Sequence, residues 1–273
     1  MTPEELLETP DLIAAGVAGD DVRRRMHGTR TTFVRVFEIH VDAPPQALPA
    51  RTHAGEFRLI GRPASLDALV SAARSAVALA GGVPVTVFSM ADLLDLRTPV
   101  RAVCEALKTA GVAAITQLPL DTVDDIELVA ADARAAGLPI LALGLDSVDD
   151  DRRLDTCRRA FELQASLGGF KAFAPLPRTI SVSRPTTGYD DVKHVALARL
   201  VVTNIEAIQV DWSIYGPKLA QVALTVGAND VDNVAAVDPG VLGTRRSPLE
   251  EIKGNITAAS LEPMERDGMF RVR

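Results

Sequence analysis

Residues 168–232 decide the fold and read GGFKAFAPLPRTISVSRPTTGYDDVKHVALARLVVTNIEAIQVDWSIYGPKLAQVALTVGANDVD. Gly168 and Gly169 end a helix, because glycine adopts the left-handed backbone conformation common at helix C-termini. The pattern then predicts a strand that stops at Pro175, a helix, a buried strand and a second helix, at residues 170–174, 190–203, 205–210 and 215–226. A strand followed by a helix, twice in succession, is typical of a parallel α/β sheet.

The same alternation extends toward the N-terminus, after two helices at residues 2–9 and 11–26. Further strands are predicted at residues 31–41, 56–60, 83–88, 112–116 and 138–143, with an eighth near 228–231. The helices between them are predicted at residues 65–80, 98–110, 122–136 and 149–167, the third opening with the capping pattern Thr122…Asp125. The chain is therefore expected to be of the α/β class and to form a (β/α)8-type, TIM-like barrel.

The first β/α unit is predicted to be truncated. Residues 42–55 hold three prolines and no helical periodicity, whereas a parallel crossover ordinarily carries a helix. One outer face of the first two strands should then be bare; it would carry Arg35, Phe37, Ile39, Val41, Phe57 and Leu59. Because monomers rarely expose large apolar patches, we expect a homodimer or a heterodimer with a related protein, unless the N-terminal helices cover this face.

No linker divides the chain. We expect a single barrel domain over residues 1–273, with N-terminal helices at 1–30, the barrel at 31–232 and a C-terminal segment at 233–273. The net charge of −7 argues against nucleic acid as a partner, and Arg23-Arg24-Arg25 is typical of a solvated helix face. No apolar run is long enough to cross a membrane. Two isolated cysteines favour a reducing, cytoplasmic location, and the frequent Ala, Arg and Asp are typical of a bacterial protein from a GC-rich genome.

Several segments together resemble a radical-SAM subfamily. They are MHGTRTTFVRV (26–36), EALKTAGVAAI (105–115), GGFKAFAPLP (168–177), TGYDDVKHVALARLVVTNIEAIQVDW (187–212), GPKLAQVALTVGANDVDN (216–233) and SPLEEIKGNITAASLEPMERDGMF (247–270). The chain resembles aminofutalosine synthase and dehypoxanthine futalosine cyclase of menaquinone biosynthesis and the related deazaflavin (FO) synthase subunit. The resemblance runs from about Leu6 to Phe270 and implies a barrel of the radical-SAM kind.

One family motif is missing. In the family the first strand leads into CxxxCxxC, whose three thiolates hold a [4Fe–4S] cluster. Here the same stretch, residues 38–61, reads EIHVDAPPQALPARTHAGEFRLIG and contains no cysteine. We therefore expect a degenerate member with no iron–sulfur cluster and no SAM binding. Cys104 and Cys157 lie 53 residues apart on separate helical patterns, which indicates small core residues.

Candidate site residues follow from the barrel, because barrel sites lie at the C-terminal ends of the strands. Glu38, His40 and Asp211 are candidate catalytic groups. The candidate ligand-binding residues at these ends are Arg62, Ser89, Gln117, Arg178, Gln209 and Asp230. The resemblance adds Trp212, Lys218 and Gln221 as pocket residues, although Trp212 at the strand end is also compatible with a core cap.

A metal site is not expected. Glu38, His40, Asp42 and His53 have suitable ligand atoms for zinc or iron, but no tight HxH or HExxH spacing is present. Two functions remain open. One is a non-catalytic partner or ligand-binding protein of the futalosine pathway, with a nucleoside or an aromatic acid as ligand. The other is an enzyme with replaced acid–base or metal-dependent chemistry, a lyase or hydrolase acting on a futalosine-like nucleoside or an enol ether of benzoate.

Overall fold

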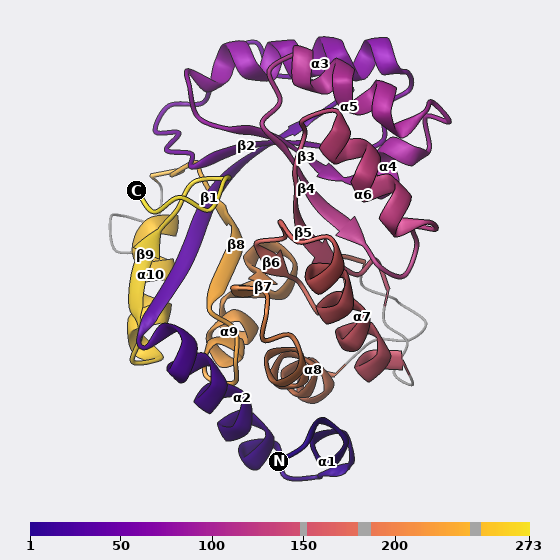
Figure 1. Cartoon of the computed structure of the whole chain (residues 1–273). Coiled ribbons are helices and arrows are strands. Elements are labelled where there is room, and N and C mark those ends of the chain that lie inside the picture. The colour runs from indigo at the N-terminus through magenta and orange to yellow at the C-terminus, as the bar shows by residue number, and fades with distance from the viewer. Residues whose placement is uncertain (148–151, 180–186, 241–246) are drawn as a thin grey trace.

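The computed structural model describes residues 1–147, 152–179, 187–240 and 247–273 (Figure 1). Eight parallel strands close into a barrel with helices between them, which confirms the predicted TIM-like (β/α)8 fold. A ninth strand is added at one edge, and the order is β2-β3-β4-β5-β6-β7-β8-β1-β9, with β2 also paired to β1. The strands are β1 Arg30–His40, β2 Glu56–Ile60, β3 Val85–Ser89, β4 Ala114–Pro119, β5 Ile140–Gly144, β6 Ala172–Phe173, β7 Ala207–Asp211, β8 Asp230–Ala235 and β9 Glu262–Glu265.

The helices form the outer layer around these strands (Figure 1). Those described are α1 Pro3–Glu8, α2 Leu12–His27, α3 Leu66–Ala80, α4 Met90–Leu94, α5 Val100–Thr109, α6 Ile126–Ala135, α7 Arg153–Ser166, α8 Gly188–Val201, α9 Trp212–Leu224 and α10 Pro248–Ala258. Local chemistry fixes several of their starts: Ser65 caps α3, and Thr187 caps α8 in a capping box with Asp190.

Two strands, β2 and β9, pair with the same edge of the long strand β1 where the barrel closes. The upper half of β1 pairs with β2, from Val36 opposite Glu56 to His40 opposite Ile60. The lower half of β1 pairs on the same edge with β9, from Arg30 opposite Glu262 to Phe33 opposite Glu265. The C-terminal segment therefore takes part in the sheet, although the sequence placed the end of the barrel at residue 232.

The predicted truncation of the first unit is confirmed, since residues 41–55, all of them described, contain no helix. The prediction of a bare outer face is wrong. Ile39 is 1% exposed and Leu59 is 1% exposed, and Val41 and Phe57 are also buried. Helix α3 packs on β2, and Leu48 of the connecting loop packs against the same core. Phe37 is half-buried against the ring of Phe57, and Arg35 pairs with Glu265 of β9.

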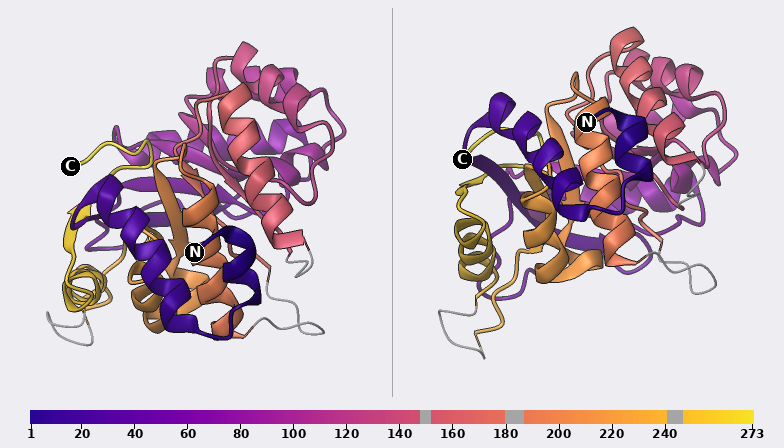
Figure 2. Two further views of the ribbon diagram at one scale, coloured as in Figure 1. Left: turned by 60° about the horizontal axis from the view of Figure 1, so that its bottom comes forward. Right: turned by 90° about the horizontal axis from the view of Figure 1, so that it is seen from below.

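The N-terminal helices lie on α8, on the other side of the barrel (Figure 2). Helix α2 lies close to α8 at Gly19, where an added Cβ would lie 3.0 Å from the Ala196 Cα atom of α8 and 2.1 Å from the Val226 carbonyl oxygen. These helices therefore cover α8 and not the first two strands.

Three local expectations differ from the structure. Helix α6 begins at Ile126, and the Thr122 hydroxyl donates to Asp146 instead of capping the helix. Helix α4 was not predicted; it begins directly after β3 because the Ser89 side chain accepts from Ala91 N. Helix α9 begins at Trp212 and is broken at Gly216, whose φ of 72° is left-handed. The start predicted at Asp149 for the seventh helix lies outside the described residues.

Candidate functional site

A network of paired charges lies in the barrel interior and is called the lower layer below. It consists of Arg58, Arg266, Glu56, Asp230 and Asp232. Arg58 of β2 is 1% exposed and donates to both oxygens of Glu56, at 2.8 and 3.0 Å, and to both oxygens of Asp232, at 2.8 Å each. The Thr86 hydroxyl of β3 also donates to Glu56. These two carboxylates raise the pKa of Arg58 well above its usual value against the opposing effect of burial. Arg58 is therefore a fixed internal cation.

A second buried arginine comes from the C-terminal segment. Arg266 donates to both oxygens of Asp230, at 2.6 and 2.8 Å, and lies 3.8 Å from Asp232. Its guanidinium stacks on Phe270 at 3.8 Å from the ring centroid. Phe270 in turn packs against Ala142, Ala172 and Ala207, small side chains of β5, β6 and β7. The C-terminal segment thus fills one end of the barrel interior.

A bulge in β8 directs side chains at the upper end of the barrel. The β1–β8 register shifts between Phe33 and Arg35, and Asn233 has a φ of 59°. A bulge inserts one residue and re-aims its neighbours. The Asn233 amide donates to Glu38 at 3.0 Å and to Asp211 at 3.3 Å, so it joins the upper ends of β1 and β7.

Asp211 is the unusual titratable group of this end. It is the last residue of β7, and its carboxylate caps α9 by accepting from Ile214 N at 2.8 Å. Its register partner on β8 is Asp232. Burial, followed by the negative charge of Asp232, raises the pKa of Asp211 to about 7. Asp232 stays ionised because Arg58 and Arg266 lower its pKa against the effect of burial. The pair therefore keeps one ionised member and one that exchanges a proton near neutral pH.

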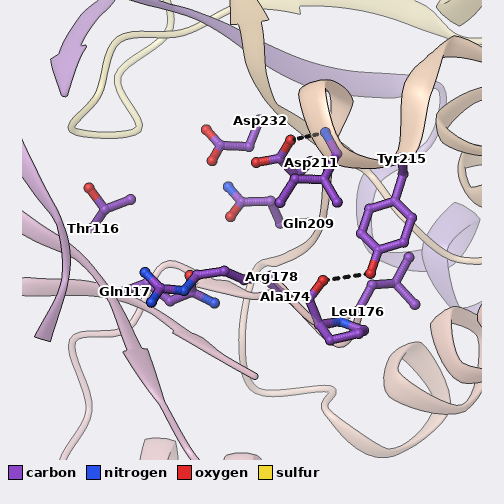
Figure 3. A pocket seen from close by; sticks show the side chains of 11 residues that line it. Thr116, Gln117, Ala174, Leu176, Arg178, Gln209, Asp211, Tyr215 and Asp232 are labelled. Atoms are coloured by element: carbon purple, nitrogen blue, oxygen red, sulfur yellow. Dashed lines mark hydrogen bonds between the residues drawn. The ribbon is translucent and has the colours of Figure 1, made fainter. Parts of the chain in front are cut away.

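A small cavity of about 30 Å³ opens beside Asp211, with room for one or two water molecules (Figure 3). Its walls come from the upper ends of β4, β7 and β8 and from the segment after β6. The lining side chains are Thr116, Gln117, Ala174, Leu176, Pro177, Arg178, Gln209, Asp211, Ile214, Tyr215 and Asp232. Tyr215 closes one side, where its hydroxyl donates to the Pro177 carbonyl at 2.6 Å.

Two polar side chains of β4 border this cavity. The Thr116 hydroxyl is buried and has no hydrogen-bond partner among the described residues. Gln117 is 6% exposed and packs over Gly144 of β5, where an added Cβ would lie 1.4 Å from the Gln117 Nε2 atom. A larger residue at 144 would therefore displace the Gln117 carboxamide from this position.

Arg178, which follows β6, is held by two carboxylates. It lies 3.1 Å from Asp92 and 2.7 Å from Asp146. Arg62 is largely exposed and also approaches Asp92, at 3.6 Å, and Asp95, at 3.2 Å. The positive charge of Arg178 is therefore already matched within the protein.

The structure brings four of the sequence-predicted residues together around the cavity: Gln117, Arg178, Gln209 and Asp211. Asp230 lies deeper and is fully buried, where it accepts from Gln209, Thr32 and Arg266. Ser89 is buried as the cap of α4, and Arg62 lies at the exposed rim. Neither Ser89 nor Arg62 lines the cavity.

Trp212 borders a second hollow of about 310 Å³. Its other lining residues are Val36, Phe37, Glu38, Ser213, Asn233, Ala235, Ala236 and Val237. Trp212 also packs partly against the core, so the structure shows both of the placements considered for it. Because Asn233 lines this hollow and contacts Asp211, the two spaces share a wall. Lys218 is exposed on α9 and Gln221 is half-buried there, and neither lines the two spaces.

Glu38, His40, Asp42 and His53, which have suitable ligand atoms for a metal but were not expected to bind one, do not form a metal site. His40, Asp42 and His53 are all exposed. Within the described ranges, no group of three or more His, Cys, Asp or Glu side chains has a geometry that could hold a metal ion. Cys104 and Cys157 are buried in the core, and burial raises their pKa values to about 11 and about 12. This confirms that both are core thiols.

Comparison with known proteins agrees with this architecture. Residues 171–273 match the model of the CofH/MqnC C-terminal region. The chain is related to this family. It is 33% identical over 136 residues to aminodeoxyfutalosine synthase of Thermus thermophilus, covering 44% of this chain and 36% of that protein. It is 28% identical over 183 residues to 5-amino-6-(D-ribitylamino)uracil–L-tyrosine 4-hydroxyphenyl transferase of Archaeoglobus fulgidus, covering 62% of this chain and 53% of that protein. These matches span about a third to a half of the length of those relatives.

Solved structures show the same fold at low sequence identity. HydG, a maturase of the [FeFe]-hydrogenase, superposes with a TM-score of 0.65 at 15% identity, over 97% of this chain and 72% of that chain. Methylornithine synthase superposes with a TM-score of 0.62 at 12% identity, over 96% of this chain and 92% of that chain. The barrel fold is thus shared with these two proteins.

The residues that contact Asp211 and form the interior charge network were not predicted from the sequence. Glu56 and Arg58 alternate along β2, which places two charged side chains on one face of a buried strand. That spacing was a usable signal for an interior ion pair. Arg266 and Asn233 gave no comparable signal, because their roles depend on the C-terminal segment and on the bulge.

Proposed function

We propose that this chain is a ligand-binding member of the futalosine/FO-synthase-like family that does not perform radical-SAM chemistry. The proposal rests on the residues available to ligate an iron–sulfur cluster. Where the family's first strand leads into three cysteines, β1 leads into a loop without any, and the two cysteines of the chain are buried on α5 and α7. A [4Fe–4S] cluster needs thiolate ligands, so the residues present do not fit the cluster. Cleavage of SAM through such a cluster is therefore not expected of this chain.

The ligand we propose is a futalosine-like nucleoside or a related small molecule, bound at the barrel mouth. The deep cavity beside Asp211 accepts one small polar group, because its volume is about 30 Å³. The hollow beside Trp212 is about ten times larger and carries Phe37 as a second aromatic side chain. A ring placed there would be oriented by Trp212, and a polar substituent that reaches past Asn233 into the cavity would bond to Gln117 and Gln209. Such a division between apolar wall and few polar groups is typical of small-molecule sites.

One observation favours the second candidate, an acid–base enzyme. A general acid or base is most effective when its pKa lies near the working pH, and the pKa of Asp211 is raised to about 7. Asp211 would hold or accept the proton, with Glu38 nearby through Asn233. His40 is exposed and is not part of that group. A lyase or hydrolase acting on the nucleoside or on an enol ether of benzoate is compatible with this placement.

The oligomer stays a prediction without structural support, because the apolar face that suggested a homodimer or a heterodimer is buried in the chain itself. A cytoplasmic location likewise remains a prediction from the two unpaired cysteines. Among the described residues, no helix is long and apolar enough to cross a membrane.

Binding is tested by adding futalosine, aminodeoxyfutalosine and their base-free forms to the purified chain. Trp212 fluorescence and the thermal midpoint should both change. Gln117→Ala should weaken binding about five- to thirtyfold, since one lost hydrogen bond in a desolvated site costs of the order of 1–2 kcal/mol. Gln46→Ala, on the exposed connecting loop, is the matched control. If no compound of this class alters either signal, the proposal fails. Turnover by wild type that Asp211→Asn abolishes would instead select the acid–base enzyme.

A further inference from the structure

The charges buried in the barrel do not balance. The cations are Arg58 and Arg266, and the carboxylates in contact with them are Glu56, Asp230 and Asp232. Both guanidinium groups are therefore already used by three carboxylates. Asp211 adds a fourth carboxyl group beside Asp232, and its hydrogen-bond donors among the described residues are the Ile214 N–H and the Asn233 amide. When Asp211 ionises, these six described groups carry two more negative than positive charges. A cation at the cavity would restore part of the balance.

The cavity also offers groups that suit a small hydrogen-bond donor. Thr116 is 8% exposed, and its buried hydroxyl has no partner among the described residues. Figure 3 shows Thr116 apart from Asp232, Asp211 and Gln209, and all four residues line the cavity. Gln117 adds a carboxamide next to it. An unmatched buried hydroxyl costs stability, so a ligand group that donates a hydrogen bond to Thr116 would gain from entering this cavity.

Arg178 lines the cavity, but its guanidinium does not make the cavity a binding site for an anion. Arg178 is bracketed by Asp92 at 3.1 Å and Asp146 at 2.7 Å. A ligand carboxylate would have to compete with both of them while it approached Asp211 and Asp232. Like charges in a desolvated site repel strongly. The local charge therefore disfavours an aromatic acid as the group that enters this cavity.

We propose that the deep cavity binds the protonated primary amine of a ligand, with Asp211 as its counter-ion and the oxygens of Thr116 and Gln117 accepting its other N–H groups. The volume of about 30 Å³ suits an ammonium head and little more. This inference rests on the proposed function, because it names the group by which the bound molecule is recognised. It separates amine-bearing ligands from their hydroxyl and carboxylate counterparts.

The neighbours of Asp211 determine how the amine and the proton compete. Asp232 faces it from β8, Arg58 from β2 lowers its pKa, Glu38 of β1 shares the Asn233 amide, and Tyr215 lies on α9. Arg178 borders the cavity from the segment after β6. In the free protein a proton neutralises Asp211 near pH 6. An ammonium group that takes this place should release that proton, whereas a neutral ligand should release none.

The test compares 5′-amino-5′-deoxyadenosine with adenosine by calorimetry at pH 6, in buffers of different ionisation enthalpy. We expect the amine to bind at least tenfold more tightly and to release close to one proton. Asp211→Asn should abolish that preference, and Asp95→Asn, an exposed carboxylate at the same end, should retain it. Equal binding of both nucleosides would overturn the amine site while leaving the proposed function standing.

A second measurement is independent of nucleoside recognition. Methylammonium chloride should lower the pKa of Asp211, followed by carboxyl ¹³C NMR, by about one unit relative to sodium chloride at equal ionic strength. Sodium acetate should have no such effect, and Thr116→Val should reduce the shift. If sodium and methylammonium act alike, or acetate binds in preference, the amine site is refuted. If neither nucleoside binds, this titration alone decides the amine site, and the futalosine compounds alone decide the proposed function.

Discussion

The two layers of the barrel interior are built from the same residue types but are paired differently. In the lower layer each carboxylate meets a guanidinium, as Glu56 meets Arg58 and Asp230 meets Arg266. In the upper layer the Asp211 carboxyl group faces another carboxylate, an amide and a cavity. Two arginines next to Asp232 keep it ionised, whereas the pKa of Asp211 is raised to about 7 by burial and by Asp232.

The difference separates what holds this barrel together from what is available to a ligand. A fully paired buried network fixes one arrangement of side chains but costs much when one member is removed. A group left without a counter-ion is unfavourable in the free protein and gains when a suitable partner binds. The predictions below test this division, beginning with the largest effect.

Removing one arginine of the lower layer should be severe. Arg58→Met leaves Glu56 and Asp232 buried without their cation, which should lower the free energy of unfolding by about 3–5 kcal/mol. Arg62→Met, at a side chain 74% exposed, should change it by less than about 1 kcal/mol. Urea unfolding of both variants measures the contrast. A loss below about 1 kcal/mol for Arg58→Met would show that the network does not stabilise the barrel.

Replacing Asp211, the carboxyl group of the upper layer that lacks a counter-ion in the described part of the chain, should raise the free energy of unfolding instead of lowering it. The pKa of Asp211 is about 7 in the folded chain and about 3.9 in the unfolded chain. Between these values the unfolded chain has released a proton that the folded chain keeps, so the contribution of Asp211 to stability falls as pH rises and levels off above about 7.

Asn resembles the protonated acid and retains the helix cap, so Asp211→Asn should raise the free energy of unfolding by about 2–4 kcal/mol at pH 8 and hardly at pH 4. Urea unfolding at both pH values measures this. Asp67→Asn, on the exposed start of α3, provides the control. A gain of the same size at both pH values would contradict a raised pKa.

The hollow beside Trp212 should contribute to binding and little to folding. Trp212→Ala should weaken nucleoside binding by about 1–3 kcal/mol if the indole anchors the ring. Calorimetry measures this, and Trp212→Phe should restore part of the affinity because it retains an aromatic face. Unchanged affinity in Trp212→Ala would show that the indole only caps the core.

The smallest effect concerns the unmatched hydroxyl. Thr116→Val keeps the shape of the side chain and removes a buried group that has no partner among the described residues. The free energy of unfolding should stay the same or rise by up to about 1 kcal/mol. Thr86→Val, which removes a donor to Glu56, should lower it instead. A loss of stability in Thr116→Val would mean that the hydroxyl is bonded in the free protein.

Much of the fold was predictable because β/α alternation is a local signal. Ser65 caps α3, as predicted, and the segment 41–55 is the helix-free loop that its prolines indicated. Gln117, Gln209 and Asp211 were found because strand ends converge in a barrel. The bare face was wrong, because burial of Ile39 and Leu59 depends on how α3 and the connecting loop pack. Arg266 was missed because its partner Asp230 lies 36 residues away and is reached only after β9 joins β1.

The most direct test of the account is anaerobic reconstitution of the purified chain with iron and sulfide, followed by metal and sulfide analysis and visible absorption. The connecting loop has no cysteine, and both thiols lie in the core with raised pKa values. We expect no more iron than in a matched sample of the Cys104→Ala/Cys157→Ala variant, and no charge-transfer band. Near-stoichiometric binding of four irons and four sulfides per chain, lost in that variant, would contradict the account.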